Sequence, residues 1–271
     1  MSPLEPFSAN RAARGNAAAP GRIRIGIGGW TYAPWRGDFY PAGLTRAKEL
    51  AFASRQLDTI EVNGTYYSSF EPATFARWRD ETPDDFVFSL KANRFATTRK
   101  QLASAGPAID RFLESGISQL GSRLGPILWQ FMPTKVFDPP DFEAFLALLP
   151  RTLDGLTLRH VLDVRHASFA TPEYLALANR YGCVTVHTDA EDVPTLRDVD
   201  GAFAYLRLMR SQASVTSGYP PAELEGWANG AGAWIRGERS RDVFIYFING
   251  AKERAPAAAV ALTKVVAAAS I

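Results

Sequence analysis

The 271-residue chain contains little cysteine and histidine and has no long apolar run. Its single cysteine, Cys183, cannot form a disulfide within the chain, which excludes a disulfide-stapled secreted fold. A lone cysteine in a strand-like segment is typical of a buried residue in a reducing compartment, so we expect a cytoplasmic protein. No stretch approaches the roughly 18 apolar residues of a membrane helix, and we expect no membrane association.

Motifs for metal and covalent chemistry are also absent. The three histidines show neither the HxxxH nor the HExxH spacing of a helical zinc site, so we expect no metal and no cofactor. Magnesium bound by Glu61, Asp163 or Asp189 is an alternative without a motif behind it. The Gly-x-Ser-x-Gly, phosphate-loop and kinase signatures are missing, which disfavours covalent serine or cysteine chemistry.

Charge of one sign does not dominate the chain. Lys and Arg total 30 against 28 Asp and Glu, a formal net charge of +2, which is no reason to expect nucleic acid as a partner. Apolar residues make up 46% and charged residues 21%, as in ordinary folded proteins. Residues 1–20 lack apolar periodicity and the apolar core of a secretory signal, so we expect a flexible tail there and one domain over residues 21–271.

Short β-rich runs alternate with longer helical patterns, which predicts βα units and a parallel sheet. The eight runs begin at Ile23, Asp58, Asp85, Pro126, His160, Gly182, Ala202 and Asp242. Pro72 and Pro172 open helical segments between them, as expected for proline in a first turn. The sixth unit, EDVPTLRDVDG, is short and broken by proline, so we expect it to be irregular. Eight strands in about 250 residues fit a closed (β/α)8 barrel of the TIM type better than an open doubly wound sheet.

Polar residues interrupt these runs near their C-terminal ends. Strands of a parallel barrel are covered on both faces and should be almost entirely apolar, so the interruptions are informative. Two pairs are spaced two apart and share a face: Glu61 with Asn63, and Asp163 with Arg165. The others are Lys91, Gln130, Arg207, Tyr246 and Asn249. Because the active sites of barrel enzymes lie at this end of the strands, the pattern predicts a polar pocket there.

Two interpretations of the charged residues stay open. They could neutralise one another in a structural salt-bridge network that closes the barrel mouth. Alternatively, Lys91, Arg165 and Arg207 hold an anionic group while Glu61 and Asp163 transfer protons. Three cations against two carboxylates favour an anionic ligand.

Loops add further candidates at the same rim. The loop GIGGWTYAPWRGDFYP after the first strand brings Trp30 and Tyr32, whose rings could stack on a sugar or base. The loop after the second strand adds Tyr66, and the loop after the third adds Arg94 in a basic stretch that extends to Lys100. A general-base role for His187, at the end of the sixth strand, is a further option.

With these residues in view, the chain resembles the YecE-like family, catalogued as domain of unknown function 72. The motifs that carry the resemblance over about residues 23–260 are IGIGGWTYAPWRGDFYP, IEVNGTYY, LKANRFATTRKQL, LGPILWQF, VLDVRHASF and DVFIYFING. The resemblance implies a TIM barrel with a polar pocket and no established reaction. The pocket positions it implies are Trp30, Tyr32, Glu61, Asn63, Tyr66, Lys91, Arg94, Gln130, Asp163, Arg165, Arg207, Tyr246 and Asn249.

The chain departs from the family pattern at several positions. Thr98 and Met209 stand where the family usually has His, Gly250 and Asp163 where it has Asp and Glu, and Phe169 where it has Trp. The loss of two histidines and an acid argues against carrying over any general-base assignment.

Three functional hypotheses follow. In the first, the protein is a metal-independent hydrolase or isomerase of a small phosphorylated or carboxylated substrate. Lys91, Arg165 and Arg207 then bind the anion, and Glu61 acts as acid or base. In the second, which the charge balance disfavours, it is a nucleic-acid-binding protein or phosphodiesterase. In the third, it binds a ligand without catalysis. The sequence indicates no oligomeric state.

Overall fold

The computed structural model describes residues 21–194, 196, 198, 200–236 and 241–269. Their main feature is one sheet whose neighbouring strands are all parallel. Its strands are β1 (Ile23–Gly28), β2 (Thr59–Val62), β3 (Val87–Lys91), β4 (Leu124–Gln130), β7 (His160–Asp163), β8 (Val184–Thr185), β9 (His187–Thr188), β10 (Ala204–Leu208) and β11 (Val243–Phe247).

The two ends of this sheet meet and form a barrel. The strand order is β8-β7-β4-β3-β2-β1-β11-β10-β9, and β8 and β9 are successive pieces of one segment separated by Val186. β8 pairs with β7 and β9 pairs with β10, so this segment completes the ring. The last predicted strand, β11, pairs with the first, β1. The predicted eight-stranded TIM-type barrel is therefore confirmed, with its sixth strand split in two.

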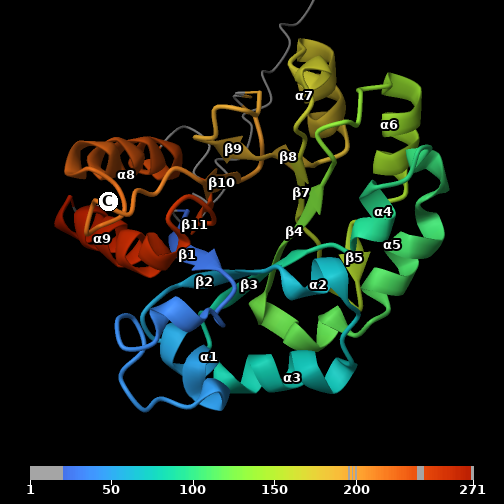
Figure 1. Cartoon of the computed structure of the whole chain (residues 1–271). Coiled ribbons are helices and arrows are strands. Elements are labelled where there is room, and N and C mark those ends of the chain that lie inside the picture. The colour runs from blue at the N-terminus through green and yellow to red at the C-terminus, as the bar shows by residue number, and fades with distance from the viewer. Residues whose placement is uncertain (1–20, 195, 197, 199, 237–240, 270–271) are drawn as a thin grey trace, which may run out of the picture.

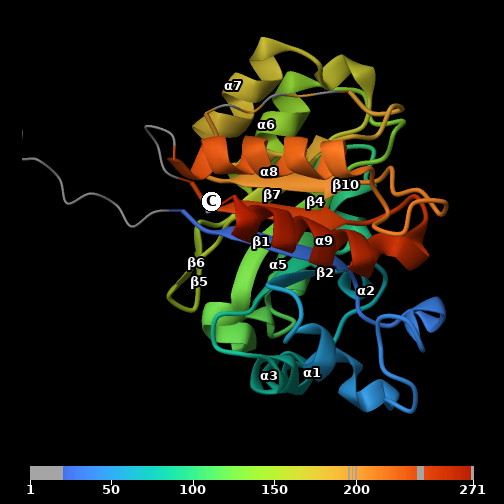
Figure 2. The ribbon, with the colours of Figure 1, turned by 90° about the vertical axis from the view of Figure 1, so that its left-hand side faces the viewer.

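Helices surround the barrel (Figure 1). They are α1 (Glu49–Ala53), α2 (Gly64–Tyr67), α3 (Pro72–Glu81), α4 (Arg94–Thr97), α5 (Gly106–Leu113), α6 (Pro139–Ala147), α7 (Pro172–Arg180), α8 (Pro221–Arg236) and α9 (Ala255–Ala268). The C-terminal helices α8 and α9 pack against each other, as Figure 2 shows. A short antiparallel hairpin, β5 (Thr152–Leu153) with β6 (Leu156–Thr157), precedes β7. The described residues between β9 and β10 form no helix, as expected for the irregular sixth unit.

The strands separate two apolar layers. One cluster fills the barrel interior and includes Tyr205, Phe244 and Tyr246, while the larger cluster packs the outer faces of the strands against the helices. Alternation along β10 shows the division, because Tyr205 lies in the inner cluster and Leu206 in the outer one. The interior below the mouth is thus a packed core, and a cavity for a ligand is expected at its end.

The remaining domain prediction is not decided by this architecture. The tail expected over residues 1–20 lies outside the described residues. The division into that tail and one domain over residues 21–271 stays a prediction.

Candidate functional site

A cavity of about 610 Å³ lies at the carboxyl ends of the strands, and we call it the central cavity. The ends of β1, β2, β3, β4 and β10, and the loops after β1, β2, β7 and β11, contribute to its wall. Its lining residues are Gly28, Gly29, Trp30, Thr31, Val62, Asn63, Gly64, Tyr67, Phe70, Trp78, Lys91, Gln130, Arg165, Arg207, Ile248, Asn249 and Lys252. The predicted site residues among them are Trp30, Asn63, Lys91, Gln130, Arg165, Arg207 and Asn249.

Arg207 is the centre of a buried ionic network beneath this cavity. Its Nε and Nη2 each donate to one carboxylate oxygen of Glu61 at 3.0 Å, and its Nη1 donates to Asp163 Oδ2 at 2.7 Å. Burial opposes the charge on Arg207, but the attraction of Glu61 and Asp163 outweighs it and raises the guanidinium pKa. Glu61 is 0% exposed and also accepts a hydrogen bond from the Tyr205 hydroxyl at 2.8 Å. Both oxygens of Glu61 therefore accept hydrogen bonds within the network, and Glu61 is not part of the cavity lining.

Arg165 extends the network to the cavity wall. It donates from Nε and Nη2 to the two carboxylate oxygens of Asp163, at 3.3 and 3.0 Å. Gln130 Oε1 accepts from Arg165 Nη2 at 3.2 Å and from Arg207 Nη1 at 3.3 Å. The Arg165 side chain keeps 21% of its surface exposed, so one edge of a fixed guanidinium faces the cavity. Asp163 forms ion pairs with two arginines at once. Both predicted acids, Glu61 and Asp163, therefore match the salt-bridge interpretation.

Lys91 has a different environment from the arginines. Among the ion pairs within 4.0 Å in the described part of the chain, none involves Lys91, and its Nζ lies 4.0 Å from the centroid of the Tyr66 ring. The residue is only 6% exposed. Burial, with the nearby positive charge of Arg207, lowers the pKa of Lys91 to about 8. A substantial fraction of this amine is therefore neutral at mildly alkaline pH and able to accept a proton or attack an electrophile.

The lining of the central cavity is cationic. Lys91, Arg165, Arg207 and Lys252 all line it, whereas its lining includes no aspartate or glutamate. The carboxylates of the network lie behind Arg207, so the groups that a ligand meets first are positive or neutral. Such a surface favours anions, and guanidinium groups held in place can bind carboxylate or phosphate with two hydrogen bonds.

Two predicted residues contribute to the wall indirectly. The Tyr66 ring supports Lys91, and the Tyr32 ring packs edge-on against Trp35, with Lys252 Nζ 4.7 Å from the Tyr32 centroid. Neither tyrosine belongs to the lining itself. Both rings position a lysine amine that does.

Two other predicted residues lie away from the cavity. Tyr246 is fully buried in the barrel interior, and its hydroxyl shares a hydrogen bond of 2.8 Å with Thr59 Oγ1. Because Thr59 is the first residue of β2, this hydroxyl points away from the mouth. Arg94 is exposed on α4, with its guanidinium 5.5 Å from the Phe95 ring centroid.

Sequence reasoning missed two residues of the site. Lys252 follows β11 in the next loop, where the run AKER signalled a cation near a strand end. Tyr205, whose hydroxyl binds Glu61, is two residues before Arg207 on β10. The period of two along a strand placed both on one face, so the sequence contained that signal.

The histidine and aspartate at the sixth strand do not face the central cavity. The His187 ring packs edge-on against Trp227 and Trp234 of α8, outside the barrel. Asp189 accepts hydrogen bonds from Met209 N at 2.6 Å and from the Tyr219 hydroxyl at 2.7 Å. The structure therefore gives His187 no position from which to act as the general base of this site.

The described residues show no sign of a metal cluster or a membrane-spanning helix. They contain no group of three or more His, Cys, Asp or Glu that could hold a metal ion. They also contain no helix with the length and apolar character needed to cross a membrane.

Comparison with known proteins identifies relatives of this chain. A family model described as a protein of unknown function, DUF72, matches residues 24–270. The UPF0759 protein YecE of Escherichia coli strain K12 is 30% identical over 142 residues, which cover 51% of this chain and 48% of YecE. The chain thus matches about half the length of this curated relative.

Solved structures show the same architecture. A DUF72 family protein from Thermotoga maritima superposes with a TM-score of 0.74 at 21% identity, covering 91% of this chain and 99% of that one. A DUF72 family protein from Enterococcus faecalis superposes with a TM-score of 0.70 at 17% identity, covering 90% and 95%. At these identities the likeness shows the fold.

Proposed function

Because the chain belongs to the DUF72 family, whose description assigns no reaction, we propose a function from its central cavity: binding of a small phosphorylated or carboxylated substrate. The observation that carries this proposal is the cationic lining, with Lys91, Arg165, Arg207 and Lys252 and no carboxylate. Among the described residues no carboxylate lies within 4.0 Å of the amines of Lys91 and Lys252, so an anion would supply the counter-charge that a neutral ligand could not.

Within this proposal the cations have different roles. Arg165 presents a guanidinium edge whose orientation is fixed by Asp163 and Gln130, so it can bind an anion with little loss of side-chain entropy. Arg207 is held by Glu61 and Asp163, which also balance its charge, so it mainly fixes the wall of the cavity beside Arg165. Lys91 approaches from the end of β3 and Lys252 from the loop after β11, with their amines over tyrosine rings.

Lys91 is also the group we propose to transfer protons. Its lowered pKa, about 8, lets the neutral amine act as a general base near physiological pH. We assign Glu61 and Asp163 to positioning the arginines, because their oxygens are already engaged by Arg207, Arg165 and Tyr205. Transfer of a proton to this amine and back to the substrate suits an isomerisation, and transfer of a proton from water to the amine suits a hydrolysis.

One observation favours a second candidate function. Every carboxylate of the network is neutralised by an arginine, so the central cavity offers no accessible acid to pair with Lys91. A ligand-binding protein without catalysis would need no such acid. The two candidates share the anion site and differ only in turnover.

The experiment compares Lys91→Met with Lys100→Met, a matched control at an exposed position outside the central cavity. Calorimetric titration measures binding of inorganic phosphate, malonate and a panel of sugar phosphates and keto acids. We expect Lys91→Met to weaken the binding of the anions by about tenfold, which is the usual effect of losing a charged hydrogen bond. The control should leave their affinities unchanged.

Turnover then separates the two candidates. Each compound that binds is incubated with the protein in heavy water. Proton NMR spectra then show whether its hydrogens exchange with solvent or whether it is converted to a product. Conversion that disappears in Lys91→Met supports the enzyme, and tight binding without conversion supports the silent binder. If no anion binds to the wild-type protein, or if oligonucleotides bind and the small anions do not, the proposed function is wrong.

A further inference from the structure

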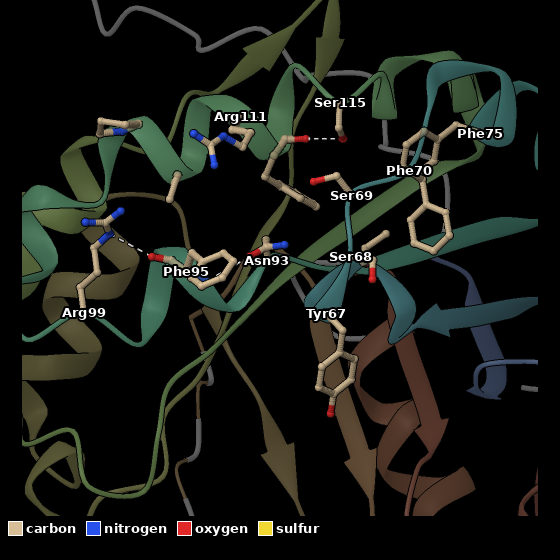
Figure 3. Close-up of a pocket in the computed structure, with 14 residues that line it drawn as sticks. Tyr67, Ser68, Ser69, Phe70, Phe75, Asn93, Phe95, Arg99, Arg111 and Ser115 are labelled. Atoms are coloured by element: carbon tan, nitrogen blue, oxygen red, sulfur yellow. Dashed lines mark hydrogen bonds between the residues drawn. The ribbon is translucent and has the colours of Figure 1, made fainter.

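A second cavity, of about 330 Å³, lies beside the central one (Figure 3). We call it the side cavity. The segment after α2, the short helix α4 and the helix α5 form its walls. Tyr67 and Phe70 line both cavities, so the two cavities adjoin at these side chains. A molecule in the central cavity could therefore continue past Tyr67 into the side cavity.

The same strand end connects the two cavities. Lys91 ends β3 and lines the central cavity, and Asn93, two residues later, lines the side cavity. Thr65 lines the side cavity and donates a hydrogen bond of 2.7 Å to the backbone oxygen of Lys91. The backbone that positions the Lys91 amine thus also forms part of the neighbouring wall.

Exposed aromatic rings flank the side cavity. Tyr67 is 63% exposed and Phe95 is 55% exposed, and both line it. Aromatic rings of this exposure next to a cavity are typical of ligand-binding surfaces, because burying them on binding is favourable. Phe70 and Phe112 add further apolar surface. This wall suits a flat apolar or aromatic group.

The side cavity is also cationic. Arg99 and Arg111 line it without an aspartate or glutamate, and within the described residues neither has a carboxylate within 4.0 Å. In Figure 3 the two arginines lie on one side of the cavity, and Ser68 and Ser69 lie on the other. Arg99 Nε donates to the backbone oxygen of Phe95, which leaves the terminal nitrogens of Arg99 for another acceptor.

We propose that the substrate spans both cavities, and that the side cavity binds its far end, an aromatic or flat apolar group with a second negative charge. The inference rests on the proposed function, because it places the first negative charge at Lys91 and Arg165. The ligand class is then an elongated dianion with an apolar body. One charge binds at the strand ends, the body lies against Tyr67 and Phe95, and the other charge pairs with Arg111.

The test uses three probes of increasing length: inorganic phosphate, benzoate and biphenyl-4,4′-dicarboxylate. Calorimetric titrations compare wild type with Arg111→Gln, Phe95→Ala and Lys91→Met. Arg77→Gln is the matched control, because Arg77 is exposed on α3 and lines neither cavity. Thermal unfolding of each variant confirms that it is folded.

We expect the dicarboxylate to bind wild type at least tenfold more tightly than benzoate. Arg111→Gln should weaken the binding of the dicarboxylate by about tenfold, since one charged hydrogen bond is lost. The affinity for inorganic phosphate should stay unchanged. Lys91→Met should weaken the binding of both the dicarboxylate and inorganic phosphate, whereas Arg77→Gln should weaken the binding of neither.

The outcomes separate the two proposals. If Arg111→Gln and Phe95→Ala both leave dicarboxylate affinity within about twofold of wild type, the side cavity does not bind the far end. If Lys91→Met leaves the dicarboxylate unaffected while Arg111→Gln weakens it, the two cavities do not share a ligand; either result overturns the inference. Loss of phosphate binding in Lys91→Met with no effect of Arg111→Gln would leave the proposed function standing alone.

Discussion

Replacing Arg207 by methionine should destabilise the barrel more than any surface substitution. Methionine keeps much of the length of the side chain but removes the guanidinium that bridges Glu61 and Asp163. Asp163 retains both of its hydrogen bonds from Arg165, whereas Glu61 retains only the hydroxyl of Tyr205. The main cost is therefore one fully buried carboxylate left without a counter-charge.

The expected magnitude follows from this difference. Removing one partner of a buried ion pair typically costs about 3 to 5 kcal/mol, because an uncompensated charge remains in a site of low polarity. For a chain of this size that corresponds to a fall in the thermal midpoint of about 10 °C. Removing the charge of Glu61 as well should restore a large part of the loss, so Glu61→Gln with Arg207→Met should be more stable than Arg207→Met alone.

The assay is urea and thermal unfolding followed by circular dichroism, with Arg180→Met as the control. Arg180 pairs with Glu143 at 3.0 Å, but their side chains are 63% and 43% exposed. Solvent screens such a pair, so its loss should cost less than about 1 kcal/mol. If Arg207→Met is as mild as this control, or if adding Glu61→Gln makes it worse, the reasoning about a buried uncompensated carboxylate is refuted.

Three further predictions concern single residues. Lys91→Met should stabilise the protein by up to about 3 kcal/mol at pH 7, because burial lowers the pKa of Lys91 from 10.5 to about 8. Between the folded and the unfolded pKa of Lys91, the unfolded wild-type protein binds more protons than the folded protein. Wild-type stability therefore rises with pH in this range, and the advantage of methionine should vanish by about pH 10.5. A pH-independent difference in stability would contradict this. Burial raises the pKa of the Cys183 thiol to about 12, so native protein should resist iodoacetamide that labels it in urea, as mass spectrometry would show. Gly250→Asp should lower the thermal midpoint by several degrees, because Gly250 has a φ of +78° and a Cβ there would lie 2.5 Å from Ser211 O. Gly43→Asp, at a φ of +82° with open space around it, controls for backbone strain alone, and equal effects would rule out the contact.

The Gly250 geometry also bears on the departures from the family pattern. The YecE-like pattern usually has aspartate at this position, but the backbone of Ser211 occupies the space that its Cβ would need. An aspartate at position 250 is therefore not compatible with this arrangement of the loops after β10 and β11. The glycine and the position of Ser211 belong together in this chain.

Much of the fold could be predicted from the sequence because buried parallel strands are short apolar runs that stand out between helical patterns. This pattern predicts all eight strand segments. It also predicts the irregular unit after the sixth strand. Local breaks were harder to see. Between β3 and β4 the helix α5 covers only Gly106–Leu113, and Gly116, at a φ of +97°, ends the helical path before the 3-10 turns. Glycine permits this backbone conformation but does not require it, so the sequence could not reveal it.

The candidate site was predictable as a set of residues and not as a set of roles. Polar side chains at strand ends marked Glu61, Lys91, Asp163, Arg165 and Arg207 in advance, because charge is costly in a covered strand unless it has a partner. The geometry matches the salt-bridge interpretation of the two acids, and the anion-binding interpretation stays a prediction. The carboxylates are engaged in a salt-bridge network, and the cations that line the cavity form the surface on which the anion proposal rests.

The sequence by itself determined the eight strands, their order along the chain and the polar residues at their ends, since these depend on neighbours a few positions apart. Only the tertiary structure decided which charges meet. Glu61, Asp163 and Arg207 lie on β2, β7 and β10, far apart along the chain, and the closure of the barrel brings their side chains within 3.0 Å. That pairing leaves Lys91 as the buried cation without a carboxylate within 4.0 Å among the described residues, a property of three-dimensional distance that no local pattern encodes.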